Sequence, residues 1–282
     1  MRGMFTAGVI DVMMENNIEF DGAVGVSAGA AFGCNYKSRQ IGRVLRYNTR
    51  FCNDKRYCGI RSLLTTGNIF NTQFCYEEVP MKYDVFDFET YRSNPMEFYV
   101  VCTDIESGKA IYKRCDDFDH RGFDWIRASS SMPLVAQIVE IEGQKLLDGG
   151  IADSIPVRFF EDIGYNRNIA VLTQPKGYQK KKNETLALIK WKYRKYPNLV
   201  EAVANRHLMY NEMLEYIAAQ EQNGRLLVIR PDEALPIGRV EKDPEKLRAV
   251  YEIGRRAAEK QLENIRRYLD TDAGTGSAKT KL

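Results

Sequence analysis

A serine between two glycines is the first feature of this sequence with recognisable chemistry. The run Gly25-Val26-Ser27-Ala28-Gly29 has the spacing G-x-S-x-G, and it follows a short apolar run and precedes a segment of small residues. On a nucleophile elbow this spacing presents the serine in a strained strand-to-helix turn. The N–H groups and dipole of the following helix favour negative charge there. The same residues also suit a turn in which small side chains only help a helix pack on a strand.

The flanking pattern favours the nucleophile. An apolar strand is predicted over 22–26 and a helix over 28–38, which is the context that an elbow requires. A phosphate-binding loop is excluded because the run has neither G-x-G-x-x-G nor G-K-[ST] spacing.

The base that would activate Ser27 is not an evident histidine. The chain has two, His120 and His207. The order Ser27, Asp148, His207 resembles a Ser-Asp-His triad, but only 26 residues precede Ser27, too few for the strands before an α/β-hydrolase elbow. His207 falls within a helical pattern, so we expect it on a helix surface or in the core, and we expect His120 in an ordinary loop. A carboxylate is therefore the expected base.

Asp148 is the carboxylate best placed for this role. It ends a predicted strand and is followed by Gly149 and Gly150, which allow another segment to approach closely. An aspartate has an ordinary pKa of about 3.9 and is a weak base. It would therefore have to lie within hydrogen-bond reach of the serine and be partly desolvated. Taken alone, the segment also fits a plain Asp-Gly turn in which Asp148 is an Asx cap.

The predicted elements that position these residues alternate between strands and helices. The pattern predicts helices over 4–17, 28–38, 123–133, 155–164, on both sides of Pro197 within 185–223, and over 243–269. Strands are predicted over 22–26, 97–105, 109–115, 137–150 (a hairpin turning at Glu142-Gly143), 167–174 and 225–231. Residues 40–95 are expected to be an irregular helical insertion. This alternation predicts an α/β domain with a mainly parallel central sheet.

We expect one domain over 1–270, with the catalytic segments in 1–170 and a helical part in 185–270. The polar residues 271–282 are predicted to be a disordered tail.

The composition excludes several classes of function. The net charge is +3 and no basic patch is interleaved with aromatics, so no nucleic-acid partner is expected. None of the six cysteines has C-x-x-C or zinc-ligand spacing, and no metal or cofactor is predicted. The sequence has no signal peptide and no apolar run near the ~18–20 residues of a membrane helix. We therefore expect a cytoplasmic protein.

Four segments in order make the sequence resemble a known family. They are RGMFTAGVIDVM (2–13), GVSAG (25–29), ASSSMP (128–133) and DGGIADSIPV (148–157). From Met1 to about Ala170 the chain resembles the patatin-like phospholipase family, in particular its bacterial branch. The resemblance implies a three-layer α/β/α fold and an acyl-ester hydrolase without a catalytic histidine. Ser27 would be the nucleophile and Asp148 the base, acting through an acyl-enzyme.

The resemblance also implies the partners. The substrates would be phospholipids, lysophospholipids or neutral acyl esters, with peripheral membrane contact and no metal or cofactor. Oligomeric state is left open. Gly25 and Gly29 would shape the elbow, and Gly149 and Gly150 the aspartate motif.

One part of the family pattern is incomplete. The family carries G-G-G-x-[RK]-G after its first strand, and its N–H groups form the oxyanion hole. Here Met1, Arg2 and Gly3 match only the end of this motif, and the first strand is missing. Loss of an oxyanion donor costs on the order of 10²–10³ in rate. We expect Ala28 and Gly3 to supply the remaining donors. Arg2 would either meet a lipid phosphate or be a solvated charge.

Three explanations compete for this departure: a coding start assigned too late, a chain cut short, or a weakened relative. We favour the first, which predicts in-frame codons for an apolar strand and a Gly-Gly-Gly run upstream of Met1. The third would make the protein a non-catalytic or weakly active protein that binds lipid or acyl chains.

Three further segments have two interpretations each. Ser129, Ser130 and Ser131 belong to a block that lies near the active site in the family, and here we interpret them as structural. Segment 46–76 is either a lid that faces lipid or a packed helical subdomain. The lysine-rich loop 176–183 is interpreted as solvated, with contact to an anionic membrane, worth about 1 kcal/mol per residue, as the alternative.

Overall fold

The computed structural model describes residues 1–119 and 121–270. The predictions for His120 and for the tail 271–282 lie outside these residues.

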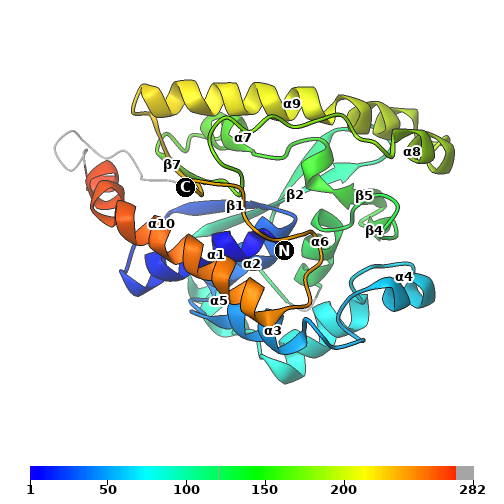
Figure 1. Cartoon of the computed structure of the whole chain (residues 1–282), viewed down its shortest axis with the longest axis horizontal. Coiled ribbons are helices and arrows are strands. Elements are labelled where there is room, and N and C mark those ends of the chain that lie inside the picture. The colour runs from blue at the N-terminus through cyan, green and yellow to red at the C-terminus, as the bar shows by residue number, and fades with distance from the viewer. Residues whose placement is uncertain (120, 271–282) are drawn as a thin grey trace.

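The described chain forms helices and strands close to the predicted ranges (Figure 1). The helices are α1 (Gly3–Glu15), α2 (Ala28–Lys37), α3 (Arg43–Phe51), α4 (Ile60–Thr66), the π-helix η1 (Phe74–Tyr83), α5 (Phe88–Ser93), α6 (Gly122–Ser129), the 3₁₀ turn η2 (Gly149–Ile151), α7 (Val157–Asp162), α8 (Leu186–Lys192), α9 (Pro197–Gln222) and α10 (Pro244–Asp270). The strands are β1 (Gly22–Val26), β2 (Glu97–Asp104), β3 (Ala110–Arg114), β4 (Val139–Ile141), β5 (Gln144–Asp148), β6 (Asn168–Val171) and β7 (Leu226–Ile229).

The main sheet is mixed, which corrects the expectation of a mainly parallel one. In the part of the chain that the structure describes, β1 pairs with β2 in parallel, but the pairs β2–β3, β2–β5 and β4–β5 are antiparallel. The short connections explain this difference, because a turn as tight as Glu142-Gly143 can only join antiparallel neighbours. Both turn residues have positive φ, 53° and 77°. Strands β6 and β7 pair in parallel in a separate two-stranded sheet.

The strands are covered by helices on both faces, so the predicted three-layer α/β/α arrangement is confirmed. Successive strand side chains point to opposite faces. On β5, Leu146 packs in the core built with α1, α2, α6 and α10, whereas Leu147 packs with Ile189, Leu199 and Val203 from α8 and α9. Figure 1 shows β1 and β2 between α9 along one side and the α1–α10 pair along the other.

The first and last helices touch backbone to backbone. A Cβ on Gly8 of α1 would lie 2.1 Å from the Tyr251 carbonyl oxygen, and one on Gly254 of α10 would lie 2.0 Å from the Phe5 carbonyl oxygen. Both positions therefore require glycine. The buried Asp11 accepts a hydrogen bond of 2.7 Å from the Tyr251 hydroxyl. The C-terminal helix thus belongs to the same core as the first residues of the chain.

The insertion between β1 and β2 is helical, as predicted, and has an aromatic cluster of its own. Phe51, Tyr57 and Phe74 are buried against one another together with Cys58 and Val79. Of the two interpretations of segment 46–76, this packing corresponds to the helical subdomain.

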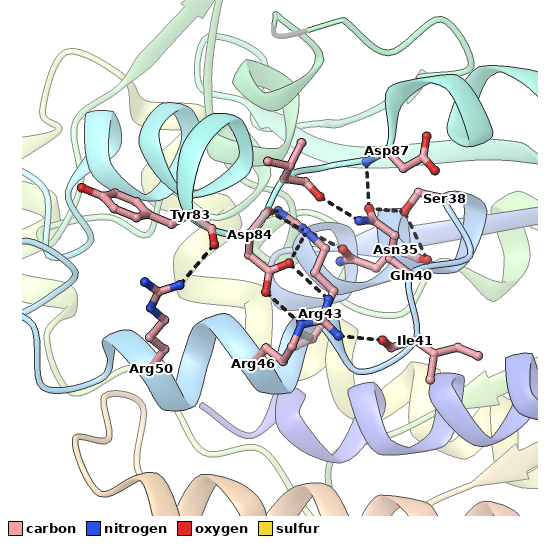
Figure 2. A network of polar contacts seen from close by, with 12 residues as sticks. Asn35, Ser38, Gln40, Ile41, Arg43, Arg46, Arg50, Tyr83, Asp84 and Asp87 are labelled. Atoms are coloured by element: carbon pink, nitrogen blue, oxygen red, sulfur yellow. Dashed lines mark hydrogen bonds and ion pairs between the residues drawn. The ribbon is translucent and has the colours of Figure 1, made fainter.

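A polar network joins this insertion to α2. Figure 2 shows Arg43 and Arg46 directed at Asp84, which follows η1. The buried Arg43 donates to the Asp84 carbonyl oxygen at 2.6 Å and to Asn35 Oδ1 of α2 at 2.8 Å. Because α2 carries the elbow at its other end, this network helps to fix the helix on which the candidate site is built.

Candidate active site

The carboxyl ends of β1 and β5 lie next to each other at the candidate site. Val26, the last residue of β1, pairs with Val101 of β2, and Asp148, the last residue of β5, pairs with the next residue, Cys102. Strands β1 and β5 run in opposite directions along β2, so their carboxyl ends converge. The register alone therefore brings Ser27, which follows β1, next to Asp148.

Ser27 sits in a strained turn between β1 and α2. Its φ is 55° and its ψ is −118°, values that a residue with a side chain rarely adopts. The side chain is partly exposed. Such strain persists only where the surrounding structure imposes it, and it is the geometry expected of a nucleophile elbow.

The two elbow glycines differ in whether a side chain would fit at their position. A Cβ on Gly25 would lie 2.5 Å from the backbone N of Ala30, so α2 can start only because Gly25 has no side chain. A Cβ on Gly29 would meet nothing within 4 Å. The alternative interpretation, in which small size at Gly29 serves close packing, is therefore not supported at this position.

The Ser27 hydroxyl donates a hydrogen bond of 2.7 Å to Asp148 Oδ2. The other carboxylate oxygen, Oδ1, accepts from the Gly150 N–H at 2.8 Å. The Asp148 backbone is held as well, by its N–H to the Ser131 carbonyl oxygen and by its carbonyl oxygen to the Thr103 hydroxyl, both at 2.8 Å. Asp148 is thus fixed in the orientation that meets Ser27.

Burial and charge act on Asp148 in opposite directions. The residue is buried, and desolvation raises the pKa of its carboxyl above the ordinary value. The nearby Arg206 guanidinium, the Ser27 hydroxyl and the Gly150 N–H oppose this rise because they stabilise the carboxylate. A buried carboxylate with a raised pKa is a stronger base than a solvated one.

Ser129 contacts the elbow directly. The Ser27 N–H donates to the fully buried Ser129 hydroxyl oxygen at 2.8 Å, while Ser131 binds the backbone of Asp148. This serine block, interpreted as structural from the sequence, touches the backbone of both members of the pair. The order of the family blocks was the only sequence signal for this contact, because 102 residues separate Ser129 from Ser27.

The proposed oxyanion donors lie together. Gly3 begins α1 and Ala28 begins α2, and a Cβ on Gly3 would lie 2.9 Å from the Ala28 Cβ. The first N–H groups of a helix have no intrahelical acceptor. Two helix N-termini therefore converge beside Ser27. Arg2, at the start of α1, is exposed.

The remaining predicted residues are also placed. Gly149 lies against β2, where a Cβ would be 2.1 Å from the Val101 carbonyl oxygen, and Gly150 lies beside Arg206. His207 is on α9, as expected, and its Nδ1 lies 3.0 Å from the carbonyl oxygen of Ala204 in the same helix. Two basic residues near the pair, Lys180 and Arg206, were not predicted as site residues.

The described residues offer neither a metal site nor a membrane-spanning helix. Across residues 1–119 and 121–270, no group of three or more His, Cys, Asp or Glu side chains is arranged to hold a metal. Within those ranges, no helix combines the length and apolar character needed to cross a membrane. A groove of about 610 Å³ is lined by Tyr76 and Phe123 among others, but neither Ser27 nor Asp148 lines it.

These features define a class of protein: a three-layer α/β domain that pairs a serine on a nucleophile elbow with an aspartate at the end of a neighbouring strand. The chain belongs to the patatin-like phospholipase family, which residues 1–160 match. Residues 196–270 match a second domain, DUF6363, described as a domain of unknown function. Family membership implies a hydrolase of lipid esters in general.

Three relatives illustrate the range of the similarity. The uncharacterized protein YjjU of Escherichia coli (strain K12) is 27% identical over 272 residues, which are 90% of this chain and 72% of YjjU. A patatin-like phospholipase domain-containing protein of Caenorhabditis elegans is 27% identical over 188 residues, 60% of this chain and 16% of that protein. An NTE family protein of Mycobacterium tuberculosis (strain H37Rv) is 24% identical over 170 residues, 60% of this chain and 45% of that protein. The similarity thus spans less than half of the last two proteins.

Proposed function

We propose that this protein is a serine acyl-ester hydrolase of the phospholipase A, lysophospholipase or lipid esterase type, with Ser27 as nucleophile and Asp148 as base. The observation that carries the proposal is the 2.7 Å hydrogen bond from the Ser27 hydroxyl to Asp148 Oδ2, made at an elbow with a positive φ. A serine in a plain packing turn needs neither this strain nor a buried carboxylate partner.

The geometry supports a two-step reaction. In the first step the Ser27 oxygen attacks the ester carbonyl carbon while its proton passes to Asp148. The tetrahedral intermediate collapses to the acyl-enzyme, and Asp148 gives the proton to the departing alcohol. In the second step Asp148 takes a proton from water, which attacks the acyl group. The acid is released as the proton returns to Ser27.

The negative oxygen of each intermediate needs donors beside Ser27. The N–H groups of Ala28 and Gly3, at two converging helix starts, are the donors we assign. Arg2 at the mouth of the site would contribute charge and substrate contact.

A fluorophosphonate probe tests the nucleophile, because it reacts with an activated serine. We expect the chain to be labelled, Ser27→Ala to abolish labelling, and the control Ser107→Ala, in an exposed turn, to be labelled like the unmodified chain.

The base is tested by substrate hydrolysis. Hydrolysis of a lysophospholipid and of a short-chain ester should fall by on the order of 10³–10⁴ in Asp148→Asn.

Two results would contradict the proposal. Labelling that persists in Ser27→Ala would show that Ser27 is not the nucleophile. Full esterase activity in Asp148→Asn would show that Asp148 is not the base. A chain that binds lipid but is never labelled would be a non-catalytic relative.

A further inference from the structure

Basic side chains gather beside the Ser27–Asp148 pair. The largest charge effects on Lys180 come from the Arg206, Arg2 and Arg239 guanidinium groups and from the Asp148 carboxylate. Burial lowers the pKa of the Arg206 guanidinium, the Asp148 carboxylate raises it, and the Arg239 charge lowers it. Of these four cations, Arg206 and Lys180 act on the Asp148 carboxylate itself, whereas Arg2 and Arg239 act on Lys180.

Lys180 is held in place by the fold. Its backbone N–H donates to Asn211 Oδ1 of α9 at 2.7 Å, and its carbonyl oxygen accepts from Asn211 Nδ2 at 3.1 Å. Its ammonium lies 4.9 Å from the centre of the Tyr210 ring. Lys181 and Lys182 of the same loop are exposed, whereas Lys180 is half-buried. The interpretation of the whole loop as solvated is therefore wrong at Lys180.

Arg206 lies against the glycine that follows the base. A Cβ on Gly150 would be 2.9 Å from Arg206 Nη2 and 3.0 Å from Asp148 Oδ1. The absence of a side chain at Gly150 therefore makes room for a guanidinium beside the carboxylate. Arg206 Nε is buried and, within the described ranges, has no hydrogen-bond partner. This nitrogen is thus a donor that the described residues do not use.

Gathering like charges in a partly desolvated place is unfavourable. Burial and the neighbouring arginines lower the pKa of Lys180 to about 8. Clusters of this kind are typical of sites that bind an opposite charge. A phosphate offers several acceptor oxygens and the charge that would compensate the cluster, and arginine matches its geometry.

We propose that Arg206 and Lys180, with Arg239 and Arg2 at the rim, bind the phosphate of the acyl-ester substrate, so that the protein prefers lipids with an anionic phosphate headgroup over neutral esters. This inference rests on the proposed function and names its substrate class. Lys180, Arg206 and Arg239 lie outside the family match over 1–160. The C-terminal part of the chain would therefore supply the headgroup subsite, and the family core the dyad.

The test compares two substrates that differ only in the phosphate. Lysophosphatidic acid and monoacylglycerol with the same acyl chain are hydrolysed as monomers by the unmodified chain, by Lys180→Gln, and by the control Lys182→Gln. We expect kcat/KM to be higher on lysophosphatidic acid. The ratio of the two kcat/KM values should fall about tenfold or more in Lys180→Gln, mainly through KM, because a charge-assisted contact is lost. Lys180→Arg should restore most of the ratio, and Lys182→Gln should leave it unchanged.

The outcomes separate this inference from the proposed function. Equal hydrolysis of both lipids, or an unchanged ratio in Lys180→Gln, would overturn the phosphate subsite and leave the hydrolase intact. Hydrolysis of neither lipid would count against the proposed function. Calorimetry on Ser27→Ala then tests the subsite without catalysis. Binding of lysophosphatidic acid that is weakened by Lys180→Gln would support it. Inorganic phosphate bound as tightly as the lipid would assign the site to free phosphate and overturn the headgroup preference.

Discussion

At the scale of single residues, the chemistry proposed for Ser27 depends on the protonation state of Asp148, on which burial and nearby groups have opposite effects. Burial favours the protonated carboxyl, which cannot act as a base, whereas the Arg206 guanidinium and two hydrogen bonds favour the carboxylate. Because the raised pKa strengthens the base only while it stays ionised, the site would work best where Asp148 has just lost its proton.

The pH dependence of hydrolysis should report this balance. Since the pKa of Asp148 is raised, kcat/KM on a neutral ester should rise with pH along an acid limb whose midpoint lies above the ordinary aspartate value. In Arg206→Gln the carboxylate loses a stabilising charge, so the midpoint should move further upward. A stopped assay between pH 4 and about 8 measures both. A midpoint at the ordinary value, or one unmoved in Arg206→Gln, would contradict this assignment.

The two elbow glycines should respond differently to the same substitution. Gly25→Ala places a methyl group 2.5 Å from the Ala30 backbone, so we expect a loss of at least about 3 kcal/mol in the free energy of unfolding. Gly29→Ala meets no atom within 4 Å, so its effect on stability should stay within about 1 kcal/mol. Urea denaturation compares the two.

The second variant should still show a functional effect. Gly29 lies two residues after Ser27 in the elbow, so we expect a methyl group there to lower kcat/KM on a lipid ester while the protein stays folded. Equal destabilisation by both substitutions would show that the elbow packs differently.

How far the residues of the site could be predicted depends on whether their signal is local. Ser27 and Asp148 stand in short motifs with turn chemistry of their own, so the sequence is enough to propose them as site residues. Ser129, Lys180 and Arg206 belong to the site through contacts between distant segments, and these depend on strand register and on the path of a loop. The order of the family blocks gives an indirect signal for Ser129, and nothing in the sequence motifs indicates Lys180 or Arg206.

At the scale of elements, two arginines of the polar network in Figure 2 differ in burial, and burial sets how much an ion pair contributes to stability. Asp84 accepts contacts from two arginines. The Arg43 side chain is 4% exposed and the Arg46 side chain 55%. The buried member also binds Asn35 of α2, so it connects three helices.

Matched substitutions should separate the two arginines. Arg43→Gln leaves the Asp84 carboxylate and Asn35 without their buried partner, and we expect a loss of about 3 kcal/mol in the free energy of unfolding. Arg46→Gln removes a solvated contact and should cost less than about 1 kcal/mol. Chemical denaturation of the two variants measures the difference. Equal effects would mean that the Arg43 side chain is not buried in solution.

Strand direction was the part of the fold that the sequence predicted least well. The alternation of strands and helices indicated the layers correctly, because each element carries its own apolar pattern. Whether two strands pair in parallel is decided by the connection between them. The segments 105–109 and 142–143 are too short for a crossover, and that short length makes the main sheet mixed.

At the scale of the whole molecule, the two matched segments of the chain share one core. Helix α10, within 196–270, packs on α1, within 1–160, and α9 packs on the turn that follows Asp148. The C-terminal part therefore lies on both sides of the sheet. This arrangement supports our proposal that residues 1–270 form a single domain, because separating the two segments would expose apolar core surface of both.

The glycine contact between the first and last helices allows a test of that proposal. Gly254→Ala puts a methyl group 2.0 Å from the Phe5 carbonyl oxygen, which α10 can relieve only by moving away from α1. We expect a loss of about 3 kcal/mol in the free energy of unfolding. The exposed neighbour Arg256→Ala is the control and should change stability by less than about 1 kcal/mol.

The two tryptophans of the chain lie in different parts of it, one within 1–160 and the other within the helical part 185–270. Trp125 lies on α6 and Trp191 on α8. If residues 1–270 unfold as one unit, fluorescence of Trp191→Phe and of Trp125→Phe should give the same urea midpoint, and Gly254→Ala should lower both midpoints equally. A midpoint that falls for Trp125 but not for Trp191 would show that the C-terminal part folds independently. In that case the phosphate subsite could move relative to the dyad instead of being fixed beside it.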